Sequence, residues 1–323
     1  MPLPLPPWLD AWGLDAGALL LALALDLVWR EPPAALHPVV WMGRLIAFLE
    51  RRAPGPERPM AALAAGLGIA LLVPFGCGVL AWLAAIALRA AGPLPYLLGT
   101  ALLLKPTFAV GELGRAARGT LRALQAGAIH RARDSLRRLV SRDTRTLGAP
   151  QVAMAAIESV AENTTDSFVA PWLAFALFGL PGAVAYRAID TLDSMIGYRG
   201  RYEYLGKAAA RLDDLLNLVP ARISAALLLA GGALRRLPAR RGWRMAWRDH
   251  RRTESPNAGW TIGACAGLLG VALEKLGHYR IGHGLPDPTW HDLAAAQRLA
   301  YAGAALAVPL AVAVTAVRGL LWG

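Results

Sequence analysis

The stretch from Ala61 to Leu88 reads AALAAGLGIALLVPFGCGVLAWLAAIAL and contains no charged side chain. As an α-helix, which rises about 1.5 Å per residue, it would extend about 40 Å. The hydrocarbon core of a bilayer is roughly 30 Å thick, so the segment is long enough to cross it with some tilt. The chain is therefore expected to be an integral membrane protein.

Working outward, six further apolar runs alternate with polar segments, at 13–29, 94–110, 168–188, 215–234, 260–273 and 299–321. Lys105-Pro106 interrupts the second of these runs, and Gly179-Leu180-Pro181-Gly182 interrupts the third. Proline and glycine break regular helix. We predict an all-α, polytopic membrane fold of four or five spans, with broken or re-entrant helices.

Composition agrees with this class. Hydrophobic residues make up 56% of the chain and charged residues 17%, against roughly 45–50% and about 25% in soluble domains. No polar linker divides the chain, so one integral membrane domain, 1–323, is expected. Residues 1–12 lack the basic start of a signal peptide, and the first apolar run is expected to be retained as a span.

Positive charge is concentrated in two segments, about 111–150 and 235–256, which we expect to be cytoplasmic. The first interleaves arginine with leucine at near-helical spacing, which predicts an amphipathic helical pair at the membrane surface. The second carries Trp243 and Trp247 among its arginines, as interfacial loops do. The net charge of +12 is confined to these blocks, so the bilayer is an expected partner and nucleic acid is not.

Three carboxylates precede the run at 168–188. Glu158, Glu162 and Asp166 are spaced four apart, which places them on one face of a helix with Asn163 beside them. A solvated helix face is one interpretation. However, ionisable groups that lead into an apolar membrane segment usually have a function.

Two further groups of charged residues follow: Arg187, Asp190 and Asp193, and then Arg211, Asp213, Asp214, Asn217 and Arg222. Carboxylates three apart suit Mg²⁺, and arginine binds phosphate in a bidentate manner. The alternative for Arg187 and Asp190 is a structural ion pair. No Walker A loop, GxGxxG or GxSxG motif is present. The residues alone indicate a polar membrane site for anionic, Mg²⁺-bound ligands.

The side of the membrane that carries 187–214 stays open at this stage. If the runs at 168–188 and 215–234 both cross, this stretch lies outside the cell, away from ATP. If the first of them is re-entrant, the stretch returns to the cytoplasm, and irregular backbone is tolerated where it is buried in protein.

Several polar blocks are distinctive in their order. They are His37-Pro38-Val39, Gly43-Arg44, Ala161-Glu162-Asn163-Thr164, Thr191-Leu192-Asp193-Ser194-Met195-Ile196-Gly197-Tyr198, Ala210-Arg211-Leu212-Asp213-Asp214, Asn217-Leu218-Val219-Pro220-Ala221-Arg222 and Ser255-Pro256-Asn257-Ala258-Gly259-Trp260. From about Leu25 to Gly284 the chain resembles the adenosylcobinamide-phosphate synthase family of cobalamin biosynthesis.

The resemblance implies a multi-pass enzyme of the bacterial cytoplasmic membrane with its active site on the cytoplasmic side. It implies an ATP-dependent ligase that joins a propionate carboxylate of adenosylcobyric acid to the amine of (R)-1-aminopropan-2-ol phosphate. Mg²⁺ is the expected cofactor and ATP the co-substrate. Ethanolamine phosphate as the amine, and membrane enzymes of late cobalamin assembly as partners, stay open.

We assign roles within this resemblance on charge and placement. The metal candidates are Asp190, Asp193, Asp213 and Asp214. The catalytic candidates are Glu158, Glu162, Asp166 and Asp193. The substrate-binding candidates are His37, Arg44, Asn163, Arg187, Tyr198, Arg199, Arg211, Asn217, Arg222, Ser255 and Asn257. Asparagine is commoner in the family at position 190, which favours Asp193 over Asp190.

Two other functions compete with the ligase. One is a non-catalytic membrane signalling homologue of the same superfamily, and the retained polar blocks count against it. The other is a transporter built around broken helices, and the absence of an evident internal repeat counts against that.

Overall fold

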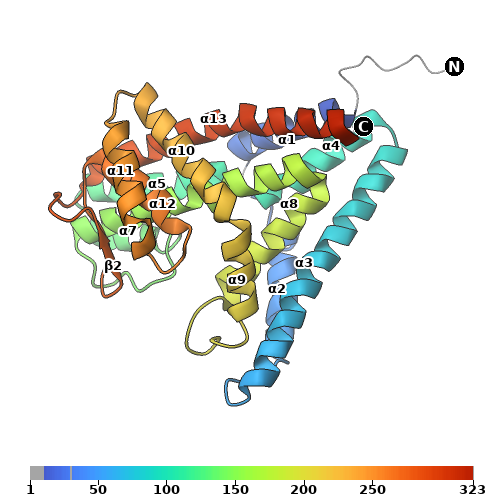
Figure 1. Ribbon diagram of the computed structural model, residues 1–323, viewed down its shortest axis with the longest axis horizontal. Coiled ribbons are helices and arrows are strands. Elements are labelled where there is room, and N and C mark those ends of the chain that lie inside the picture. The colour runs from blue at the N-terminus through green and yellow to red at the C-terminus, as the bar shows by residue number, and fades with distance from the viewer. Residues whose placement is uncertain (1–10, 30, 323) are drawn as a thin grey trace. The chain divides into compact units, whose positions relative to one another are not determined.

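The computed structural model describes residues 11–29 and 31–322, and the expectation about the N-terminal segment falls mostly outside this part. The structure is helical apart from one short hairpin (Figure 1), which confirms the predicted all-α class. The elements are α1 (Ala11–Val28), α2 (Pro38–Glu50), α3 (Pro59–Ala90), α4 (Pro93–Leu104), α5 (Val110–Gln125), α6 (Ile129–Leu136), α7 (Ala149–Thr164), α8 (Ala170–Ile196), α9 (Lys207–Leu216), α10 (Leu218–Leu234), α11 (Ala239–Asp249), α12 (Ala258–Leu269), the antiparallel strands β1 (Leu273–Lys275) and β2 (Tyr279–Ile281), and α13 (Trp290–Trp322).

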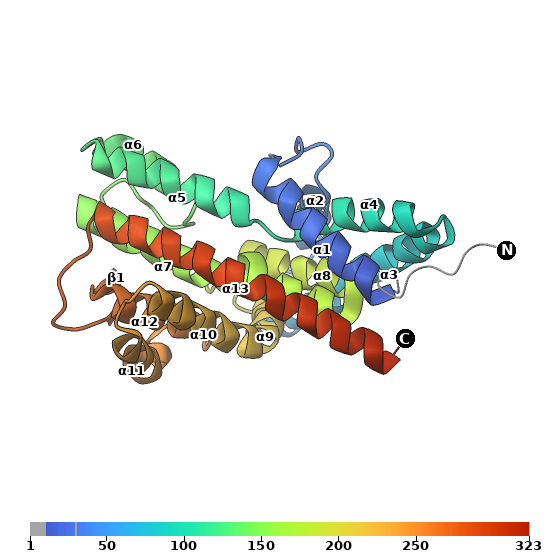
Figure 2. The same ribbon diagram turned by 90° about the horizontal axis from the view of Figure 1, so that it is seen from above.

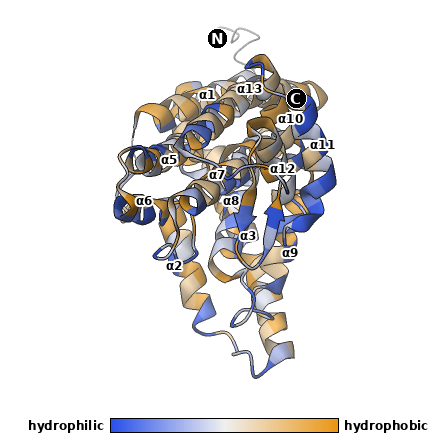
Figure 3. Cartoon of the chain, turned by 90° about the vertical axis from the view of Figure 1, so that its left-hand side faces the viewer, coloured by the Kyte–Doolittle hydropathy of each residue, from blue (hydrophilic) through white to orange (hydrophobic). Residues whose placement is uncertain are grey.

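Four helical segments of the described residues are long and apolar enough to cross a membrane: Pro59–Ala90, Pro93–Gln125, Ala149–Ile196 and Trp290–Leu321. Lys207–Leu216 and Leu218–Leu234 make a fifth if the bent pair counts as one span. The hydropathy colouring shows the same apolar character along α3 (Figure 3). These helices confirm the polytopic prediction.

The first apolar run forms α1, an 18-residue helix that is not among the candidate spans found in the described part of the chain, so its role as a span stays a prediction. Its length of about 27 Å is at the short end of the range for a membrane helix. It also carries Asp15 and Asp26, and both side chains are buried inside the protein.

The chain folds into two compact units. The first contains the described residues of 1–109, 170–216 and 309–323. Within it, α3 packs along α8 and α9, α2 packs against α8, and α1 packs against α4 (Figure 1). Ile46, Leu192 and Ile196 are among the buried side chains that fill the core between α2, α3 and α8. This core fixes the positions of the polar residues at the end of α8.

Both predicted helix breaks are confirmed. Helix α4 ends at Leu104, and a 3₁₀ turn over Lys105–Thr107 follows. Helix α8 breaks at Gly179, whose φ of 68° is left-handed, and its two halves run in different directions (Figure 1). Arg318 Nη1 donates to the carbonyl oxygen of Phe175, one turn before the break, at 3.0 Å. Arg318 is itself paired with buried Asp15.

The second unit contains 110–169 and 217–308. Helices α5 and α6 lie side by side (Figure 2), which confirms the predicted helical pair in the first basic segment. Helix α7 packs against α5, α6 and α12, while α11 and α10 pack against α12. Since the two units interleave along the sequence, no single cut separates them, and the assignment of one membrane domain stays a prediction.

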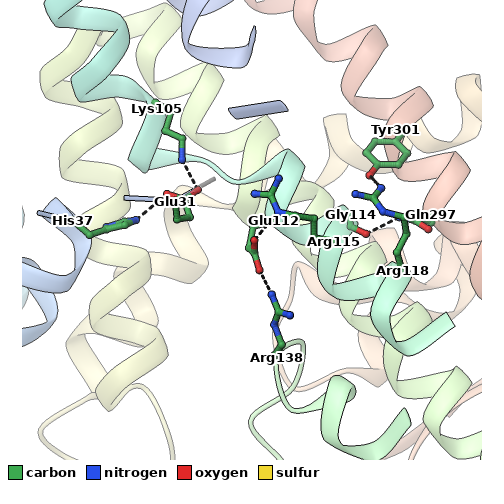
Figure 4. Close-up of polar contacts among 10 residues, drawn as sticks. All are labelled: Glu31, His37, Lys105, Glu112, Gly114, Arg115, Arg118, Arg138, Gln297 and Tyr301. Atoms are coloured by element: carbon green, nitrogen blue, oxygen red, sulfur yellow. Dashed lines mark hydrogen bonds and ion pairs between the residues drawn. The ribbon is translucent and has the colours of Figure 1, made fainter. Parts of the chain in front are cut away.

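Arginines of the first basic segment are largely paired inside the protein. Glu112 accepts hydrogen bonds from Arg115 at 2.9 Å and from Arg138, and Arg118 donates to the Tyr301 hydroxyl at 2.6 Å (Figure 4). Arg133 donates to the carbonyl of Leu147 at 2.8 Å. Much of the positive charge of this segment is therefore engaged in contacts within the protein.

Candidate functional site

An acidic group forms in the first unit where α9 packs against α8. Asp190 and Asp193 lie one turn apart near the end of α8, and Asp193 is close enough to Asp190 and Asp214 for their charges to repel it. Arg187 pairs with Asp190 at 2.9 Å, so the structural ion pair foreseen as an alternative is present. The structure thus brings together three of the four predicted metal candidates.

The number of carboxylates in this group suits a magnesium–nucleotide complex. No three His, Cys, Asp or Glu side chains within residues 11–29 and 31–322 are arranged to hold a metal ion together. Mg²⁺, however, commonly takes one or two protein carboxylates and completes its octahedron with water and phosphate oxygens. Asp193 with Asp190 or Asp214 supplies such a pair.

Most of the other predicted residues on α2, on α9 and in the loop after α8 have exposed side chains. Arg211 approaches Asp214 at 3.7 Å, but its side chain is 76% exposed. Tyr198 and Arg199 are exposed in the loop after α8, and Arg44 is exposed on α2. Asp213 is half-buried on α9. Their binding roles stay predictions.

A second polar group of the first unit joins Glu31, His37 and Lys105 (Figure 4). Lys105 Nζ lies 2.7 Å from Glu31 Oε1, and His37 Nε2 lies 3.0 Å from Glu31 Oε2. The His37 Nδ1 atom accepts from the backbone N–H of Val39 and so caps α2. Nδ1 therefore carries no proton, and Nε2–H is the atom that donates to Glu31. Both ring nitrogens of His37 are engaged within the protein.

Pairing with His37 and Lys105 lowers the pKa of Glu31. Burial opposes its ionisation, but the hydrogen bonds from His37 and Lys105 outweigh burial and hold the pKa of Glu31 below its ordinary value. Lys105 is buried, and an ammonium in such a place needs a carboxylate partner. Glu31 therefore allows a charged lysine at the break between α4 and α5.

In the second unit the predicted carboxylates lie on α7. Glu158 is buried; Arg142 Nη2 donates to its Oε2 at 3.2 Å, and the Tyr279 hydroxyl of the β-hairpin is hydrogen-bonded to it. Burial and the negative charge of Glu158 raise the pKa of Tyr279, so its hydroxyl stays protonated and donates. Glu162, one turn further along, is half-buried and also lies near Tyr279. Glu158 is thus held in place, whereas Glu162 retains access to solvent.

The expected straight stripe of carboxylates does not continue to Asp166. The α-helix ends at Thr164, and residues Thr165–Val169 form a π-helical turn that contains Asp166. A π-turn has more residues per turn, so a spacing of four no longer returns to the same face. Asn163 spans the transition: its Nδ2 donates to the Ser159 carbonyl at 2.9 Å, and its Oδ1 accepts from Ser167 at 2.8 Å. Such π-turns occur frequently at functional sites.

The predicted loop before α12 brings further site residues together. Arg222 Nη1 donates to Asn257 Oδ1 at 3.1 Å, and its guanidinium lies 5.0 Å from the centre of the Trp260 ring. Ser255 Oγ accepts from the backbone N–H of Asn257 at 3.2 Å. Asn217 is buried at the N-terminus of α10. Arg222, Ser255 and Asn257 therefore form one connected group.

Four residues of these groups were missed by the sequence reasoning: Glu31, Lys105, Arg142 and Tyr279. Lys105 did carry a signal, because a charge inside an apolar run needs a partner. Arg142 is one of many arginines in its segment, and nothing in the sequence near Tyr279 distinguishes it.

Comparison of the sequence with known proteins identifies the family to which the chain belongs. Residues 19–309 match the family model described as CobD/Cbib protein. The chain belongs to the CobD/Cbib family. This confirms the resemblance inferred from the sequence.

Three curated relatives of this CobD/Cbib protein show the extent of the match. The cobalamin biosynthesis protein CobD of Dehalococcoides mccartyi is 45% identical over 267 residues, covering 81% of this chain and 85% of the relative. The probable cobalamin biosynthesis protein CobD of Methanothermobacter thermautotrophicus is 40% identical, covering 83% and 87%. The CobD protein of Geobacter metallireducens is 40% identical, covering 86% and 87%. No solved structure matches the chain significantly.

Proposed function

We propose that this protein acts in cobalamin biosynthesis as adenosylcobinamide-phosphate synthase, an ATP-dependent ligase. The observation that carries the proposal is the family match over residues 19–309 together with relatives named for cobalamin biosynthesis. The specific reaction is supported by the resemblance of the polar blocks and by acidic and basic groups suited to phosphate chemistry.

The reaction requires activation of a carboxylate, because a carboxylate does not condense with an amine at neutral pH. In the proposed sequence, a carboxylate oxygen of adenosylcobyric acid attacks the γ-phosphorus of ATP, and ADP leaves. The amine of aminopropanol phosphate then attacks the acyl carbon, and inorganic phosphate leaves with one former carboxylate oxygen. One proton is released from the ammonium, so a base is needed.

The first unit supplies groups suited to the nucleotide. Asp193, with Asp190 or Asp214, would hold Mg²⁺, which would neutralise the negative charge of the phosphates. Arg187 and Arg211 are placed beside these carboxylates, where a guanidinium binds phosphate oxygens. All of these acids and arginines lie on two helices that pack against each other, α8 and α9.

The second unit supplies groups suited to the amine. Glu158 is buried, whereas Glu162 is half-buried and open to solvent, so Glu162 is the better base within the predicted stripe. Asn163 is fixed by Ser159 and Ser167 and would orient the substrate beside it. Arg222 and Asn257 provide a cationic and an amide group for a phosphate or propionate.

The test is a ligation assay in detergent with adenosylcobyric acid, aminopropanol phosphate, Mg²⁺ and ATP. A corrinoid mass gain equal to the amine minus water, dependent on ATP, is expected. Asp193→Asn should abolish this gain in a folded protein, whereas Asp143→Asn, which alters an exposed carboxylate paired with Arg145, should not. The absence of any gain in folded wild-type protein, with either candidate amine, would favour the signalling homologue.

A further inference from the structure

Helix α11 has one packed face and one exposed face. The packed face, which includes Gly242, Met245 and Ala246, lies against α12. The backbones approach so closely that a Cβ on Gly267 of α12 would lie 2.6 Å from the Cα of Gly242. The opposite face exposes two tryptophans, Trp243 at 51% and Trp247 at 62%. Packing against α12 therefore fixes which face of α11 points outward.

The two exposed tryptophan rings contact each other, and one of them packs on the buried ring of Trp260. The rings of Trp243 and Trp247 are 5.8 Å apart, and Trp247 meets buried Trp260 edge-on at 5.7 Å. The His250 ring stacks on the Trp260 ring, with 4.3 Å between the ring centres. Large apolar rings with a polar N–H, held at a surface, are typical of the boundary between membrane and water.

The arginines around α11 differ from those of the first basic segment. In that segment most arginines have partners, as described above. The side chains of Arg235, Arg240 and Arg244 are exposed and have no carboxylate partner within the part of the chain that the structure describes. Figure 3 shows the strongly hydrophilic character of α11. This face therefore carries positive charge that the protein itself leaves unbalanced.

The position of α11 in the chain agrees with a bilayer surface. Apolar α10, part of the fifth candidate span, ends at Leu234, and Arg235 follows directly. A chain that leaves the hydrocarbon passes through the headgroup layer at such a point. In that layer tryptophan and arginine side by side meet acyl chains and phosphates, respectively.

We propose that the exposed face of α11 binds the phosphate headgroups of anionic phospholipids, with Trp243 and Trp247 in the interface and Arg240 and Arg244 on the phosphates. Charge complementarity selects this occupant, because a neutral lipid would leave the arginines unbalanced. This inference is independent of the ligase reaction.

The test uses full-length protein in nanodiscs of phosphatidylcholine with a minor fraction of phosphatidylglycerol. Bromine, which quenches tryptophan fluorescence, is placed near the headgroup end of the acyl chains of either the phosphatidylglycerol or an equal amount of the phosphatidylcholine. The lipid composition is then identical, and only the carrier of the quencher changes. The difference between wild type and W243F/W247F isolates the two exposed tryptophans from the remaining ones.

Quenching of this pair should be several-fold stronger from brominated phosphatidylglycerol. The excess should disappear in R240Q/R244Q and persist in R122Q/R131Q, which removes the same charge from exposed arginines of the first basic segment. Because each of these changes lies on an exposed surface, all variants are expected to fold, and gel filtration checks this.

Three results would overturn the proposal. Equal quenching by the two brominated lipids would show no preference for the anionic headgroup. Excess quenching that survives R240Q/R244Q would remove the arginines as its source. No quenching of the pair by either lipid would place this face in water, where a soluble protein partner would fit it better.

Discussion

Gly197 lies directly against the side chain and the carbonyl of Asp193. It follows the last residue of α8, and its N–H donates to the Asp193 carbonyl at 2.8 Å. A Cβ at this position would overlap Asp193 Oδ1 and would lie 2.6 Å from the Asp193 carbonyl oxygen. Non-bonded heavy atoms pack at about 3.5 Å, so Gly197→Ala should displace Asp193 by roughly 1 Å.

A displacement of about 1 Å in a reacting group costs on the order of 100-fold in rate, which corresponds to about 2.7 kcal/mol of activation free energy. We therefore expect Gly197→Ala to lower the ligation kcat about 100-fold at saturating substrate. The assay follows corrinoid mass in detergent-purified protein that elutes as folded material on gel filtration.

Gly78→Ala is the matched control, because its Cβ would meet Ala185 Cβ at 3.6 Å and the Pro181 carbonyl oxygen at 3.7 Å, both ordinary contact distances. It should ligate at the wild-type rate. A folded Gly197→Ala protein with wild-type kcat would refute the reasoning, since the carboxylate would have moved without consequence. If that variant fails to fold, Asp193→Asn, which preserves side-chain size, answers the same question.

The remaining predictions concern residues that only the structure identified. Glu31→Gln removes the charged partner of buried Lys105. This change should lower the free energy of unfolding by about 2–3 kcal/mol, a value between those for exposed and for buried ion pairs. An unchanged unfolding midpoint in denaturant would contradict this. Because the folded pKa of Glu31 is lowered, its contribution is present near neutral pH and is lost as pH falls below about 4. The difference in stability between wild type and Glu31→Gln should therefore shrink in acid, and a constant difference would exclude this linkage. Tyr279→Phe should lower kcat about 10-fold, because Tyr279 holds Glu158 and lies beside the proposed base Glu162. Tyr301→Phe, which removes a hydroxyl bonded to Arg118, should leave kcat unchanged. Equal rates for both variants would show that the Tyr279 hydroxyl is not needed.

Much of the fold follows from local features of the sequence. The uninterrupted run at Ala61–Leu88 predicted α3, because hydropathy over about 20 residues decides whether a helix can span a bilayer. The breaks at Lys105 and Gly179 were predictable for a similarly local reason, since proline removes a backbone donor and glycine allows positive φ. The burial of Asp15 and Asp26 of α1 inside the protein is a tertiary property, which the local sequence does not reveal.

The candidate site was less predictable because its contacts join distant segments. Glu158 and Tyr279 are far apart in sequence, and the hairpin that carries Tyr279 has only three residues per strand, too short for a pattern of alternation. The π-turn over Asp166 is bridged by a side-chain hydrogen bond between Asn163 and Ser167, which spacing alone does not reveal. Charge and order in the sequence selected the candidate residues, while the contacts of each candidate required the structure.

Oxygen atoms show whether ATP activates the corrinoid carboxylate for amide formation, because an acyl phosphate passes one carboxylate oxygen to the released phosphate. Adenosylcobyric acid labelled with ¹⁸O in its free carboxylate is incubated with the protein, aminopropanol phosphate, Mg²⁺ and ATP. The masses of the corrinoid and of the released phosphate are then measured in the same reaction. Amide product together with one ¹⁸O atom in each inorganic phosphate is expected. Amide product with unlabelled phosphate, or no amide product from folded protein, would contradict this expectation.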